Sequence, residues 1–123
     1  MKLAVALSVV VFSCTLSMSA PAKADAQLAV SICEYVAKDN KGRLRKKLKE
    51  ARVKLRNIYD GISCGGNSLL RHAMINGADK AGTFIVKKLP AKYLAGSGDF
   101  DWAQSNGHGG TATAAAIKSR AGL

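Results

Sequence analysis

The clearest structural element in the sequence covers residues 41–59, which read KGRLRKKLKEARVKLRNIY. Six apolar residues of this stretch fall within about 100° of one another at 3.6 residues per turn, which predicts one amphipathic α-helix. The stripe lacks Trp and Phe, so we expect it to pack in a protein core rather than at a membrane surface. Its members are Leu44, Leu48, Ala51, Leu55, Ile58 and Tyr59.

The other faces of this stretch carry nine basic residues and one acidic residue, Glu50. Several of the basic residues are four positions apart, and each such pair destabilises a helix by about 0.2 to 0.5 kcal/mol. An anionic partner would relieve this repulsion, although a solvated face that keeps the protein soluble explains the same charges. The residues that we expect to bind an anion are Arg43, Lys46, Lys47, Lys49, Lys54 and Arg56.

Three further helices are expected around this one. Apolar residues at three- and four-residue spacing predict a helix over residues 26–36, and Asp39 or Asn40 can serve as the N-cap of the basic helix. A third helix is expected to begin at Asn67 or Ser68 and to run to about residue 75. A fourth is expected over residues 80–89, where Pro90 stops it. The sequence therefore predicts an all-α, four-helix domain over residues 25–94.

Residues 95–123 have a different composition, rich in Gly, Ala and Thr. Their apolar periodicity is too weak to offset the entropy of ordering the chain, which predicts a flexible tail. Phe100 and Trp102 stand among acidic residues in this segment. They can form a small docking motif, or they can fold back onto the domain.

The first 24 residues have the pattern of an export signal. Lys2 precedes an apolar stretch over residues 3–16, and Ala22, Lys23 and Ala24 form an A-x-A cleavage site. Cleavage after Ala24 would give a periplasmic or secreted product with no transmembrane segment. A competing interpretation is a lipoprotein signal in which Cys14 is acylated.

Two cysteines, Cys33 and Cys64, follow the expected cleavage site. In an exported chain such a pair indicates a disulfide, which would contribute about 3 to 4 kcal/mol to the stability of a small domain. The whole sequence has 19 basic and 8 acidic residues, a net charge of +11. Export disfavours nucleic acid as the partner of this charge, which leaves an anionic envelope component or an acidic protein.

An enzymatic function has little support in the sequence. His72, in the third expected helix, and His108, in the Gly-rich tail, both lack a carboxylate or nucleophile at a diagnostic spacing. A lone helical histidine such as His72 is more often a surface or partly buried packing residue than a catalytic base. Neither a catalytic residue nor a cofactor is expected. Four aspartates could form a weak metal site only if folding gathered them, and helix capping and tail solubility explain them already. They are Asp60, Asp79, Asp99 and Asp101.

Two resemblances add to this picture. Residues 66–77, GNSLLRHAMING, followed by Phe84, Ile85 and Val86, resemble the helix pair of one ankyrin repeat. That resemblance implies a helix-turn-helix geometry and, as an alternative function, protein–protein interaction near Asn76, Gly77 and Asp79.

The longer stretch over residues 28–89 resembles a family of small exported proteins from marine γ-proteobacteria, known only as a domain of unknown function. LAVSICEYV at 28–36, RLRKKL at 43–48, IYDGISC at 58–64 and SLLR at 68–71 carry the resemblance. It implies export and paired cysteines, but no activity. The function we expect is a non-enzymatic module that presents its basic helix to an anionic partner.

Overall fold

A computed structural model describes residues 26–123, and the predicted signal segment and Cys14 lie outside the described residues. The described part of the chain is all helical, with eight α-helices, a 3₁₀ turn and no strand, so the all-α class is confirmed and the expected number of four helices is wrong. The elements are α1 (Ala26–Ala37), α2 (Lys41–Ala51), α3 (Leu55–Ile58), η1 (Tyr59–Gly61), α4 (Leu69–Ile75), α5 (Asp79–Lys88), α6 (Ala91–Gly96), α7 (Asp99–Ser105) and α8 (Ala112–Ala121).

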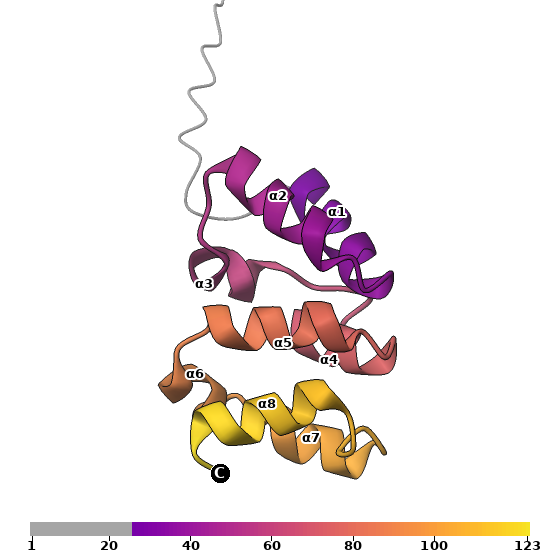
Figure 1. Cartoon of the computed structure of the whole chain (residues 1–123), viewed down its shortest axis with the longest axis vertical. Helices are drawn as coiled ribbons and strands as arrows, with labels where there is room; N and C mark the ends of the chain where they lie inside the picture. The colour runs from indigo at the N-terminus through magenta and orange to yellow at the C-terminus, as the bar shows by residue number, and fades with distance from the viewer. Residues whose placement is uncertain (1–25) are drawn as a thin grey trace, which may run out of the picture.

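Three helical hairpins stack on one another in chain order (Figure 1): α1 with α2, α4 with α5, and α7 with α8. Each hairpin turns at a residue with positive φ, Asp39 (52°), Gly77 (63°) and Gly107 (78°). The next amide closes the turn on a carbonyl five residues back, which satisfies the end of the first helix. These bonds join Asn40 N to Tyr35 O (2.8 Å), Ala78 N to Ala73 O (2.8 Å) and His108 N to Ala103 O (2.7 Å).

Short polar side chains fix where the helices begin. Asn40 caps α2 by accepting from Arg43 N at 3.1 Å, and Ser68 caps α4 by accepting from Arg71 N at 3.2 Å. Asp39 instead caps a distant helix, because its Oδ1 accepts from Ala81 N, in the first turn of α5, at 2.8 Å. Asp39 thereby ties the first hairpin to the second.

The predicted disulfide is confirmed, since Cys33 and Cys64 are bonded. It joins α1 to the segment that precedes α4, and the two cysteines are 31 residues apart in sequence. The core around it contains most of the expected apolar stripe. Its buried members are Leu44, Leu48, Leu55, Ile58 and Tyr59, whereas Ala51 is exposed.

The single helix expected over residues 41–59 is divided in two, and that prediction was wrong. α2 ends at Ala51, its C-cap Arg52 has a left-handed φ of 55°, and α3 begins only at Leu55. Arg52 N donates to Lys49 O and Val53 N donates to Leu48 O, so the turn is closed by the helix's own carbonyls. The helical spacing of the apolar residues continues across the break, which is why the sequence suggested one helix.

The flexible tail expected over residues 95–123 is also wrong. This segment contains α7 and α8, and α8 packs closely on α5. Gly82 of α5 lies against Thr113 of α8, where a Cβ on Gly82 would come within 2.8 Å of Thr113 Cγ2. Small side chains allow this approach and give almost no hydrophobic pattern, although alanine is the strongest helix former.

Candidate anion-binding site

A hollow of about 600 Å³ lies where α2, α3, α5 and α8 come together. The C-terminal ends of α2, α5 and α8 reach the same edge of the stack, the left edge in Figure 1. We call this feature the basic hollow, because seven of the residues that line it are basic and none is acidic. The seven cations are Arg45, Lys49, Lys54, Arg56, Lys87, Lys88 and Arg120.

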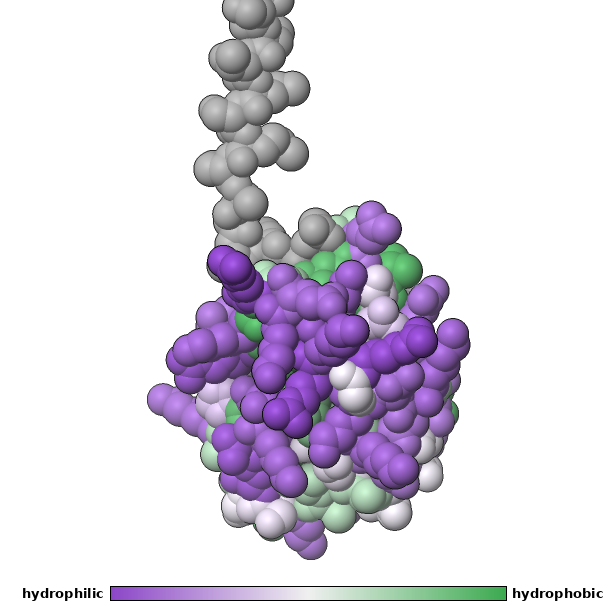
Figure 2. Space-filling view, turned by 45° about the horizontal axis from the view of Figure 1, so that its top comes forward, coloured by the Kyte–Doolittle hydropathy of each residue, from purple (hydrophilic) through white to green (hydrophobic). Residues whose placement is uncertain are grey.

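Apolar side chains form the rest of the hollow: Leu48, Val53, Leu55, Phe84, Leu89 and Pro90. With the α1–α2 end brought forward, hydrophilic side chains cover most of the visible face, and the apolar colour is strongest at its upper edge (Figure 2). The basic hollow thus combines cations with an apolar lining.

The break between α2 and α3 builds one wall of the basic hollow. Because the chain turns at Arg52, Lys54 and Arg56 come to line the same hollow as Lys49, which lies in the last turn of α2. In one continuous helix, Lys49 and Lys54 would lie on opposite faces, since five residues correspond to about 500° of rotation. The interruption that the sequence did not reveal therefore explains how Lys54 comes to line the same hollow as Lys49.

The end of α5 builds the opposite wall. α5 ends at Lys88 and is followed by Leu89 and Pro90, and Lys87 and Lys88 occupy its last turn. Lys88 Nζ lies 5.4 Å from the centre of the Phe84 ring, a cation–π contact. Arg120 of α8 completes the wall by donating from Nε to Leu89 O at 2.8 Å, which holds its guanidinium at the end of α5.

The positive charge of the basic hollow is not neutralised within residues 26–123. The ion pairs found there are Lys46 with Glu50 (3.9 Å) and Arg71 with Asp99 (2.9 Å), and neither includes one of the seven cations. A helix C-terminus carries about half a negative elementary charge, so three such ends supply about −1.5. Helix dipoles therefore offset only a small part of the cationic charge.

Of the six residues expected to bind an anion, Lys49, Lys54 and Arg56 line the basic hollow. The other three do not. Lys46 pairs with Glu50, Lys47 lines a smaller hollow with Glu50, and Arg43 lies exposed in the first turn of α2.

Four cations of the basic hollow were missed by sequence reasoning: Arg45, Lys87, Lys88 and Arg120. The Lys-Lys pair before Pro90 is a signal that could have been found, because basic residues in the last turn of a helix lie beside its negative end. No sequence signal places Arg120, since it comes from the segment expected to be flexible.

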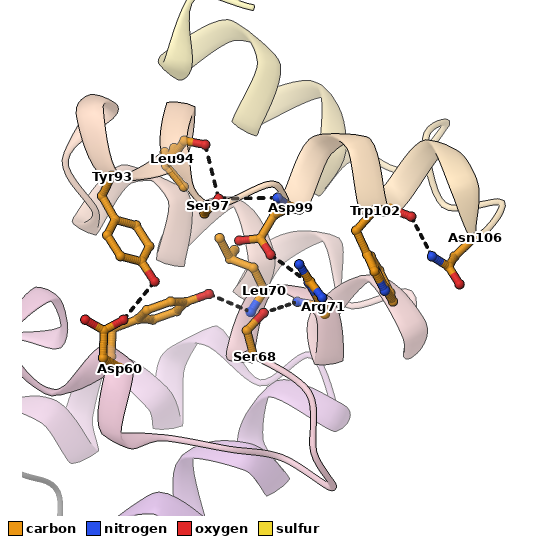
Figure 3. Close-up of polar contacts among 11 residues, drawn as sticks. Asp60, Ser68, Leu70, Arg71, Tyr93, Leu94, Ser97, Asp99, Trp102 and Asn106 are labelled. Carbon is orange, nitrogen blue, oxygen red and sulfur yellow. Dashed lines mark hydrogen bonds and ion pairs between the residues drawn. The ribbon is translucent and has the colours of Figure 1, made fainter.

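A second polar cluster joins α4 to η1, α6 and α7 (Figure 3). Tyr59 Oη accepts from Leu70 N at 3.2 Å, and Tyr93 donates its hydroxyl to Asp60 Oδ1 at 2.8 Å. Burial, with a smaller effect of the Asp99 charge, raises the pKa of Tyr59 to about 12. Burial and the bond to Asp60 also raise the pKa of Tyr93 above its usual value. Both tyrosines are therefore neutral donors or acceptors at physiological pH.

The Arg71 guanidinium lies between Asp99 and Trp102 (Figure 3). Its Nε donates to Asp99 Oδ1 at 2.9 Å, and its Cζ is 5.2 Å from the centre of the Trp102 ring. The Asp99 side chain is 4% exposed, and a buried carboxylate of this kind needs its partner. Trp102 in turn stacks on His108, with ring centres 5.4 Å apart. Phe100 and Trp102 are both partly buried against the core, so they fold back onto the domain.

Both histidines make contacts within the fold. His72 Nε2 lies 3.0 Å from Cys33 O, and a carbonyl oxygen can only accept, so Nε2 carries the proton. Residues 26–123 contain no group of three His, Cys, Asp or Glu side chains arranged to hold a metal ion. In the same part of the chain, none of the helices has the length and apolar character needed to cross a membrane.

The fold and the site define a class, a small all-α domain with one disulfide and a cation-lined hollow. The chain belongs to the family described as a protein of unknown function (DUF3718), whose model matches residues 32–96, about half of the chain. Six of the seven cations of the basic hollow fall within the matched residues, and Arg120 falls outside them. Comparison with curated proteins and with solved structures gives no significant match.

Proposed function

We propose that this chain is an exported, non-enzymatic binding module that holds an anionic envelope component or an acidic protein in the basic hollow. The observation that carries the proposal is the convergence of seven cations, without an acidic residue, on one hollow. Like charges gathered in this way repel one another, and an anionic partner would turn that repulsion into attraction. The disulfide supports export, because such bonds persist in oxidising compartments.

Two charge-reversal variants test this proposal. The hollow variant, Lys54→Glu with Arg56→Glu, changes two cations that line the basic hollow. The matched control, Lys41→Glu with Arg43→Glu, makes the same change in net charge at exposed positions outside it. The hollow variant should bind the partner at least ten-fold more weakly, because close charge pairs contribute about 1 kcal/mol each even in water.

The measurement is a pull-down from envelope extract with each variant at low and at high salt, with helicity checked by circular dichroism. The control should retain the partner at low salt and release it at high salt, where charges are screened beyond about 3 Å. Equal loss of partner in both variants would show that net charge, and not the basic hollow, drives binding. A partner that survives high salt would instead favour the alternative interface near Asn76, Gly77 and Asp79.

A further inference from the structure

The apolar lining of the basic hollow narrows the chemistry of its ligand. Leu48 and Phe84 keep 7% and 9% of their surface exposed, whereas Leu44 and Ile85, on the same two helices, are fully enclosed. Val53, between α2 and α3, is only partly buried. These three side chains line the hollow that the cations surround. A ligand that fits both parts must carry an anionic group and an apolar group.

We infer that the basic hollow binds an anionic amphiphile, a single-chain lipid with a phosphate head group. This inference rests on the proposed function and specifies its ligand. The phosphate would lie among Lys54, Arg56 and Arg120, since guanidinium groups match phosphate oxygens in pairs and lysine adds point charge. The first part of the acyl chain would lie on Leu48, Val53 and Phe84.

The size of the basic hollow agrees with such a ligand. Pockets for small molecules measure about 300 to 1,000 Å³, and this one measures about 600 Å³. The hollow is open to solvent, so the distal part of the chain can remain outside it. Each methylene that is buried should strengthen binding about four-fold. A few buried methylenes would therefore make the lipid bind clearly more tightly than its head group alone.

The placement of charge argues against an extended polyanion as the preferred ligand. The seven cations come from α2, α3, α5, α8 and the turn before α3, and they surround one concave site. An extended polymer would bind better to a continuous row of cations along α2. On that helix, however, Lys46 pairs with Glu50, and Lys47 and Glu50 both line a separate, smaller hollow. Convergent charge suits a compact head group instead.

Calorimetric titration with three probes tests the inference on the oxidised protein. Lysophosphatidic acid carries both groups, glycerol 3-phosphate carries only the head group, and lysophosphatidylcholine carries the same chain with a zwitterionic head group. All are used below their critical micelle concentrations. We expect lysophosphatidic acid to bind at least ten-fold more tightly than either of the other two, and its affinity to fall as salt is raised.

A variant of the apolar lining tests the position of the chain. Val53→Asn should lower the affinity for lysophosphatidic acid several-fold and leave the affinity for glycerol 3-phosphate unchanged. Val30→Asn is the matched control, because Val30 is 58% exposed on α1 and does not line the basic hollow. The control should bind both probes as the unaltered protein does.

The possible failures are distinguishable. Equal affinity for glycerol 3-phosphate and lysophosphatidic acid would overturn the amphiphile inference but leave an anion site, as would binding of an acidic peptide or polymer without binding of the lipid. Unchanged binding of lysophosphatidic acid by the Lys54→Glu, Arg56→Glu variant would overturn both the inference and the proposed function, because the basic hollow would then not be the site.

Discussion

At the scale of single residues, Tyr59 links the stability of the domain to alkaline pH. Tyr59 is 3% exposed, and burial together with the Asp99 charge raises its pKa from 10.0 to about 12. The folded protein therefore holds the hydroxyl proton more tightly than the unfolded chain does. The stability that this contributes is complete below pH 10 and is lost as the pH rises through about 12, a decrease of about 2 to 3 kcal/mol.

Denaturant unfolding of the protein and of Tyr59→Phe across this pH range measures the effect. The variant should lose about 1 kcal/mol at neutral pH, because Leu70 N loses its acceptor, but its stability should fall less steeply between pH 10 and 12. The Tyr59 charge also helps to raise the pKa of Tyr93, so the difference between the two curves reports Tyr59 together with its effect on Tyr93. Parallel curves would show that its pKa is not raised. The sequence predicted that the Tyr59 ring faces the core, but the partner of its hydroxyl depends on tertiary contacts that no local pattern specifies.

At the scale of elements, the contact between α5 and α8 depends on Gly82. Replacement of Gly82 by Ala would place a methyl group within 2.8 Å of Thr113 Cγ2, so the helices must separate or Thr113 must move. We expect a loss of about 1 to 3 kcal/mol in the free energy of unfolding, as for other overpacked cores. Gly96→Ala is the control, because nothing lies within 4 Å of the new Cβ there. Equal stability of the two variants in denaturant would contradict the close packing of α5 on α8.

Elements with large apolar residues were predictable, and those with small ones were not. The helices expected over residues 26–36 and 80–89 are present as α1 and α5 within a residue or two, because Leu, Ile and Phe recur at helical spacing. Half of the residues of α8 are alanine, whose burial gives no comparable pattern. Because α8 was not predicted, Arg120 could not be assigned to the basic hollow. The turn at Arg52 was not predicted either, so the position of Lys54 could not be inferred. The density of basic residues is enough to identify α2 as a candidate anion-binding element. Only the packing of the helices shows where its cations lie close to those of α5.

At the scale of the whole molecule, the disulfide connects stability to the basic hollow. The loop that Cys33 and Cys64 close contains α2, α3 and the turn between them, which supply Arg45, Lys49, Lys54 and Arg56. For a separation of 31 residues the chain-entropy model gives a contribution of about 3 to 4 kcal/mol. Domains of this size have only about 5 to 15 kcal/mol in total, so the bond is a large fraction of the stability.

The double variant Cys33→Ala with Cys64→Ala should therefore unfold at a markedly lower denaturant concentration than the oxidised protein. A reducing agent should lower the stability of the unaltered protein to about the same value and leave the double variant unchanged, which separates loss of the bond from loss of packing by the cysteine side chains. If the oxidised and reduced proteins unfold together, the packing of α1 and α2 on α4 and α5 is sufficient without the bond. If they differ as expected, the bond stabilises the fold that forms the walls of the basic hollow, and reduction should weaken binding of an anion under conditions where the reduced protein is partly unfolded.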